Sequence, residues 1–107
     1  MGEKRIRYLT KLSKFKEKIS KTLPVDKFIL FGSRAKGEHT LYSDFDIIIV
    51  SKKFKGLNKL ERPFDLYLQW DLKKPVEFLC YTPEEFKRLK NEITIIREAV
   101  KEGIEIK

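Results

Sequence analysis

The stretch FGSRAKGEHTLYSDFDIIIV, residues 31–50, decides the fold. It predicts a buried strand that ends in a Gly-Ser turn, then a polar loop, then a second strand that opens with two aspartates. Asp44 and Asp46 are two residues apart, so in a strand both carboxylates lie on the same side of the sheet. The apolar run 47–50 that follows predicts a strand covered on both faces.

Two carboxylates on one face of a strand predict a metal site. They repel each other and raise each other's pKa unless a cation lies between them. Mg²⁺ takes oxygen ligands of this kind and often shares them with substrate phosphates. A solvated strand start is the alternative, but an unpartnered carboxylate at the entrance to a buried strand costs free energy. The pair therefore favours a divalent cation.

The turn before the loop suits a phosphate. Gly32 lets the backbone approach a ligand closely, and Ser33 adds a hydroxyl and an N–H. Arg34 and Lys36 stand beside the turn, where either could contact a triphosphate or remain on the surface. The sequence has neither a P-loop nor a dinucleotide-binding glycine motif as a rival phosphate site. A phosphate-holding turn beside a metal-holding strand predicts phosphoryl or nucleotidyl transfer.

Gly32-Ser33, ten further residues, and then Asp44-x-Asp46 before an apolar strand resemble the signature of the DNA polymerase β-like nucleotidyltransferase superfamily. The chain is similar to the minimal nucleotidyltransferases, whose best-understood members act as antitoxins beside HEPN-domain toxins. The order of elements extends the resemblance over nearly the whole chain. It implies an α/β (α+β) fold, in which helices pack on a small mixed β-sheet.

In this superfamily the Asp-x-Asp pair and a third carboxylate on a neighbouring strand hold two metal ions. The matching residues are Asp44, Asp46 and Glu77, which the resemblance makes both metal-binding and catalytic. The implied reaction is attack of a hydroxyl on the α-phosphate of a nucleoside triphosphate, with release of pyrophosphate. We expect ATP as the substrate, and one or two Mg²⁺ ions as the cofactor.

The resemblance also implies that Gly32 and Ser33 hold the β- and γ-phosphates, with Arg34 beside them.

The acceptor that the resemblance implies is a tyrosine of a partner HEPN toxin, which would make the chain an antitoxin. Two alternatives remain. One is an antitoxin that binds its partner with little catalysis, and the other is a nucleotidyltransferase that acts on RNA or tRNA.

Glu77 departs from the superfamily pattern, which has aspartate at the third position. One extra methylene moves the carboxylate by about 1 Å, and misplacement on that scale can cost roughly 100-fold in rate. A structural ion pair is the alternative role for Glu77. Asp65 and Asp71 are fallback carboxylates, but they fall in a predicted helix and at its end. His39, the only histidine, is expected to be a solvated loop residue rather than a general base.

The length of 107 residues predicts one domain, 1–107. Lys and Arg number 24 against 16 Asp and Glu, and the resulting charge of +8 could attract nucleic acid, ATP or an acidic protein. This charge favours the RNA alternative. Charged residues make up 37% of the chain, which has only two Asn and one Gln. Such a composition resembles that of hyperthermophile proteins.

Cys80 is the only cysteine, so the sequence predicts neither an internal disulfide nor a cluster of thiolates for zinc. No apolar run approaches the ~20 residues that a membrane span needs. Residues 1–5 lead into a charged helix rather than the apolar core of a signal peptide. We therefore expect a cytoplasmic protein without a membrane segment.

An amphipathic helix is predicted over residues 3–22, with lysines opposite its apolar side. Its apolar residues recur at spacings of three and four: Ile6, Leu9, Leu12, Phe15 and Ile19. The lysine face is either simply solvated or a surface for RNA or an acidic partner. Strands are predicted over residues 25–31, 44–50 and 76–81.

The next helix is predicted to begin at Asn58, or nearer Arg62 with Pro63 in its first position. Its expected apolar face consists of Leu60, Phe64, Tyr67 and Leu68. A further helix is predicted from Pro83, capped by Thr82 and with a break near Asn91. A short strand or extended arm follows it over residues 104–107.

Overall fold

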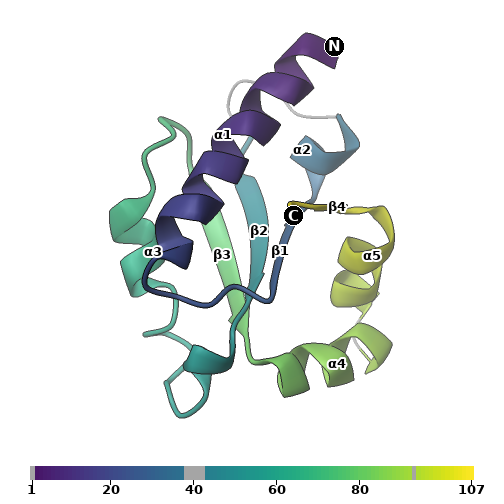
Figure 1. The fold of residues 1–107 in the computed structure, drawn as a ribbon. Coiled ribbons are helices and arrows are strands. Elements are labelled where there is room, and N and C mark those ends of the chain that lie inside the picture. The colour runs from purple at the N-terminus through teal and green to yellow at the C-terminus, as the bar shows by residue number, and fades with distance from the viewer. Residues whose placement is uncertain (1, 38–42, 93) are drawn as a thin grey trace.

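A four-stranded sheet is the frame of the molecule (Figure 1). The computed structural model describes residues 2–37, 43–92 and 94–107, and in the first helix the side chains from Tyr8 onward. In chain order its elements are α1 (Gly2–Ser20), β1 (Lys27–Phe31), α2 (Ser33–Lys36), β2 (Phe45–Val50), the 3₁₀ helix η1 (Lys52–Phe54), α3 (Phe64–Gln69), β3 (Val76–Tyr81), α4 (Pro83–Glu92), α5 (Thr94–Glu102) and β4 (Ile104–Glu105).

The strand order is β3-β2-β1-β4, with β2 antiparallel to β1 and parallel to β3. The short β4 pairs antiparallel with the other side of β1. Because of these directions, the end of β1 meets the starts of β2 and β3 at one edge of the sheet. This edge carries the residues from which the site is built.

Side chains alternate along the strands, so each face of the sheet has its own core. Phe28, Ile47 and Phe78 belong to the cluster that contains α1 residues such as Leu12 and Phe15. On the other face, Ile48 and Val50 of β2 cluster with residues of α4 and α5, among them Phe86, Leu89, Ile96 and Ala99. In Figure 1, α1 crosses in front of the strands while α4 and α5 lie to the right of β1. The central strands are thus covered on both faces, as the apolar run 47–50 predicted.

The expected fold class, a small mixed sheet with helices packed on it, is confirmed. β3 has the predicted bounds, and the tail forms the predicted short strand. The predicted break near Asn91 appears as the boundary between α4 and α5. The short helix α2 directly after Gly32 was not predicted. In the part of the chain that the structure describes, no helix is long and apolar enough to cross a membrane.

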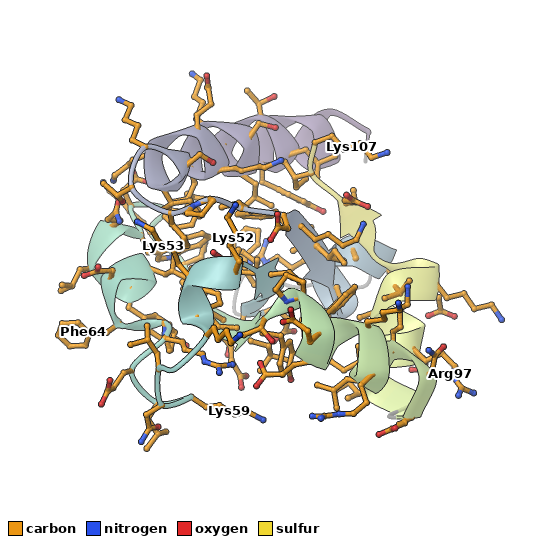
Figure 2. All side chains as sticks on the ribbon, turned by 60° about the horizontal axis from the view of Figure 1, so that its bottom comes forward. Lys52, Lys53, Lys59, Phe64, Arg97 and Lys107 are labelled. Carbon is orange, nitrogen blue, oxygen red and sulfur yellow. The ribbon has the colours of Figure 1, made fainter. Side chains whose placement is uncertain are left out.

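The apolar face predicted for the helix that is now α3 is wrong at three of its four residues. Leu60, Phe64 and Leu68 are 87%, 65% and 69% exposed, and Figure 2 shows the Phe64 ring pointing away from the ribbon. The buried residues of this segment are Leu66 and Arg62. The segment turns this side inward because Leu66 packs in the core cluster that contains α1, and because the guanidinium of Arg62 donates to Glu85 and to the carbonyl of Cys80.

Arg62 joins the loop before α3 to the start of α4. Its Nη1 donates to Glu85 Oε1 at 2.6 Å and to the carbonyl of Cys80 at 3.2 Å, while Nε donates to the carbonyl of Leu57. Glu85 also accepts from the N–H of Thr82, whose hydroxyl accepts from the N–H of Glu85 in return. The predicted helix start at Thr82 is therefore a reciprocal capping box, with a buried arginine added to it.

We expect Glu85→Gln to lower the free energy of unfolding by roughly 3 kcal/mol near pH 7, because it leaves the buried Arg62 without its counter-charge. The hydrogen bond from Arg62 is the main cause that lowers the pKa of Glu85 from 4.5 to about 2. This stabilisation is therefore complete above pH 4.5 and declines as the pH falls toward 2. Urea denaturation of both proteins from pH 7 to pH 2.5 measures it. A difference that stays constant over this range would contradict the prediction.

Candidate active site

Three residues form a row across the sheet edge where β1 ends and β2 and β3 begin. Asp46 of β2 pairs with Phe31 of β1 on one side and with Glu77 of β3 on the other. Residues directly opposite each other on paired strands present their side chains to the same face. That face is the one covered further along by α4 and α5, since Ile48 and Val50 alternate with Asp46 in register. Asp46 is half-buried and Glu77 is exposed at the start of an edge strand.

The turn after β1 touches the carboxylate of Asp46. Gly32 has φ 75° and ψ −158°, a conformation that essentially only glycine adopts. A Cβ at this position would lie 2.6 Å from Oδ2 of Asp46. Gly32 is thus required both by its backbone conformation and by the close approach of Asp46. Ser33 begins α2 directly after it, so the expected phosphate turn and the expected metal-binding strand adjoin each other.

The carboxylates of the site repel one another. Burial raises the pKa of Asp46 above its ordinary value, and the charges of Glu77 and then Asp44 raise it further. Asp44 lies just before β2 and is exposed. A bound cation would reverse this effect, because an opposite charge at close range favours the ionised carboxylate.

A cavity of about 370 Å³ opens between the row and α5. Gly32, Asp46 and Glu77 line its sheet side, and Ile95 and Glu98 are among the residues of α5 on its other wall. The volume lies within the range of small-ligand sites, ~300–1,000 Å³. The α5 wall was not predicted from the sequence, although its lining residues recur at spacings of three and four along the helix: Ile95, Glu98, Ala99 and Glu102.

A family model for the nucleotidyltransferase domain matches residues 12–102 of the chain. The chain belongs to this family. Among solved structures, a crystal structure of a candidate nucleotidyltransferase from Sulfolobus solfataricus is similar, with a TM-score of 0.69 and 25% identity. The match covers 96% of this chain and 82% of that one. No match is found among curated proteins.

The two basic side chains considered for phosphate contact in this nucleotidyltransferase domain, Arg34 and Lys36, lie in different surroundings. Arg34 is only 5% exposed, and its Nε and Nη2 donate to the carbonyl of Ser43 at 3.1 and 2.8 Å. Lys36 lines the cavity, and its ammonium lies 3.2 Å from the carboxylate of Glu102. Of these two basic residues, Lys36 is the one at the cavity.

Asp65, Asp71 and Cys80 do not join the site. Asp65 lies in the first turn of α3, and Asp71 pairs with Lys18 of α1 at 3.5 Å. Cys80 is buried, and burial raises the pKa of its thiol to about 12. His39 lies outside the described residues.

Asp44, Asp46 and Glu77 supply donors that fit a hard divalent ion. All three are carboxylates, and two of them face each other on neighbouring strands. Within residues 2–37, 43–92 and 94–107, no three acidic, cysteine or histidine side chains are close enough together to hold a metal by themselves. Mg²⁺ does not need such a closed set, because it commonly binds through one or two carboxylates, water and substrate phosphates.

We expect Gly32→Ala to cost about 1–3 kcal/mol of stability, since alanine must adopt a glycine-only conformation. The new methyl group must also displace the Asp46 carboxylate, so any metal or nucleotide affinity at this edge should fall. Gly37→Ala is the matched control. Gly37 also has a positive φ, 77°, but a Cβ there would meet no atom of the described residues within 4 Å. Thermal unfolding and Mn²⁺ binding of both variants check this, and equal losses of affinity would contradict it.

Proposed function

We propose that this domain is a Mg²⁺-dependent nucleotidyltransferase that moves a nucleoside monophosphate, AMP from ATP, onto a hydroxyl acceptor. The observation that carries the proposal is the pairing of Asp46 with Glu77 directly beside the Gly32 turn. The family match supports nucleotidyl transfer as the general reaction. The choice of ATP rests on the resemblance to adenylyl-transferring minimal nucleotidyltransferases.

Asp44, Asp46 and Glu77 are the residues proposed to hold the metal. When bound, the metal would lower the pKa of the attacking hydroxyl and neutralise charge on the phosphates. Gly32 and Ser33 bind the β- and γ-phosphates through backbone and hydroxyl donors. Lys36 can add its charge if it exchanges the Glu102 carboxylate for a phosphate oxygen.

The reaction forms a bond between the acceptor oxygen and the α-phosphorus, and breaks the bond from that phosphorus to the bridging oxygen of pyrophosphate. The acceptor proton needs a base near the reacting atoms. Glu77 is exposed at the sheet edge and is proposed to take this proton or to assist in holding the metal. Pyrophosphate leaves on the side of the Gly32 turn.

The acceptor is proposed to be a tyrosine of a HEPN-domain toxin, which would make the chain a cytoplasmic antitoxin. This part rests on the resemblance of the Gly-Ser and Asp-x-Asp motifs to those of the minimal nucleotidyltransferases.

The second candidate function is an antitoxin that binds its partner with little catalysis. The observation that favours it is glutamate, rather than aspartate, opposite Asp46.

An assay with α-³²P-ATP, Mg²⁺ and a HEPN-domain protein from the same organism tests the proposal. We expect label on the partner protein, and at least about a 100-fold loss in Asp46→Asn, because the metal then lacks a charged ligand. Asp65→Asn is the matched control: it removes an exposed carboxylate of α3 and should keep full activity. Equal labelling by wild type and Asp46→Asn would contradict the proposal. Label on added RNA instead of protein would mean that the acceptor is RNA and not a HEPN-domain protein.

We expect Glu77→Gln to lose activity as Asp46→Asn does. Glu77→Asp should keep more activity and lose at most about 100-fold, since a carboxylate moved by ~1 Å can cost that much in rate. The same labelling assay measures both variants. Full activity in Glu77→Gln would show that Glu77 has only a structural role. Partner binding without any label in the wild type would support the binding antitoxin.

A further inference from the structure

We infer that Arg34 is a positioning residue for Asp44 and not a ligand of the triphosphate. The inference deepens the proposed function and rests on it for the role of Asp44. Arg34 is only 5% exposed, although it directly follows Ser33 at the start of α2. A buried guanidinium needs partners, and in the described part of the chain the guanidinium of Arg34 has partners at Ser43 and Phe45.

The guanidinium holds the backbone on the N-terminal side of Asp44. Nε and Nη2 both donate to the carbonyl of Ser43, the residue directly before Asp44. Two donors from one planar fork fix the direction of this carbonyl more firmly than a single hydrogen bond does. The peptide that joins Ser43 to Asp44 is therefore anchored to α2.

The same guanidinium packs on the residue after Asp44. Its carbon lies 4.3 Å from the ring centroid of Phe45, a distance typical of a cation–π contact. Phe45 is 2% exposed, and its N–H donates to the carbonyl of Pro75 at the start of the neighbouring strand. Arg34 thus contacts both neighbours of Asp44 in the chain.

Asp44 needs such support because it lies outside the sheet. β2 begins at Phe45, and the ladder to β1 ends at the pair of Phe31 with Asp46. Asp46 is held by the ladder and by Gly32, whereas Asp44 is exposed just beyond it. By holding Ser43 and Phe45, Arg34 fixes the backbone on both sides of Asp44, which lies one residue before β2.

The backbone of Arg34 is itself anchored to α1. The hydroxyl of Tyr8 donates to the carbonyl of Arg34 at 2.8 Å, and the Tyr8 ring packs edge-on against Phe45. To reach a triphosphate, Arg34 would have to give up both hydrogen bonds to Ser43 and the Phe45 contact. Lys36, two residues on, lies at the cavity with its side chain half-exposed and its ammonium paired with Glu102.

The test separates metal affinity from phosphate affinity in Arg34→Met and Arg34→Lys. Mn²⁺ is titrated by electron paramagnetic resonance in the presence of α,β-methylene-ATP, and binding of the nucleotide without metal is measured in EDTA. We expect Mn²⁺ affinity to fall about 10- to 100-fold in Arg34→Met, the range for groups that orient metal ligands. Arg34→Lys should lie between Arg34→Met and wild type, because lysine lacks the fork. Metal-free nucleotide affinity should stay within about twofold of wild type.

Arg62→Lys is the matched control, since Arg62 is also a buried arginine but pairs with Glu85 away from the site. It should lower thermal stability without changing Mn²⁺ affinity. Unchanged Mn²⁺ affinity in both Arg34 variants would overturn the inference, and so would the absence of Mn²⁺ binding by the wild type. A fall in metal-free nucleotide affinity would make Arg34 a phosphate ligand. Wild type that binds Mn²⁺ as expected but transfers no nucleotide would refute the proposed function alone.

Discussion

The contact between the backbone of Gly32 and the carboxylate of Asp46 is the constraint on which the site depends. It exists because β1 and β2 are antiparallel and in a register that sets the end of one against the start of the other. It is tolerated because residue 32 has no Cβ, which would lie 2.6 Å from the carboxylate oxygen. Register and glycine together bring the Gly32 turn, which we propose binds phosphate, next to an acidic strand, and β3 adds Glu77 from the other side.

Much of this could be predicted from the sequence. The apolar run after Asp46 identified a central strand, and the resemblance put Glu77 on a neighbouring strand. The structure adds that this strand is parallel to β2, with Glu77 opposite Asp46. The α5 wall of the cavity could not be predicted, because nothing in the pattern of a helix says which part of a sheet edge it will cover. The side of the segment around Leu60 and Phe64 that faces the core was also predicted wrongly, because periodicity defines an apolar stripe but does not show that this stripe packs on the core. Arg62 and Leu66 decided that direction through their buried partners.

Arg34 illustrates a different limit of the sequence. Its position beside the Gly-Ser turn suggested a phosphate contact, because charge and proximity along the chain are all that a sequence shows. The structure instead turns its guanidinium to the carbonyl of Ser43, nine residues further along the chain. Local spacing therefore identified the motif correctly, while the partners of individual side chains required the fold.

The most direct measurement of the central claim, that the edge around Asp46 binds a metal–nucleotide complex, is paramagnetic broadening of the ¹⁵N-labelled protein by Mn²⁺ with α,β-methylene-ATP. We expect the amide signals of Gly32, Ser33, Asp46 and Glu77 to disappear first, since broadening falls steeply with distance from the ion. Signals of the lysine-bearing face of α1 should persist. Broadening that begins on α1, with the Gly32 and Asp46 signals intact, would contradict the site and favour nonspecific binding to the basic surface.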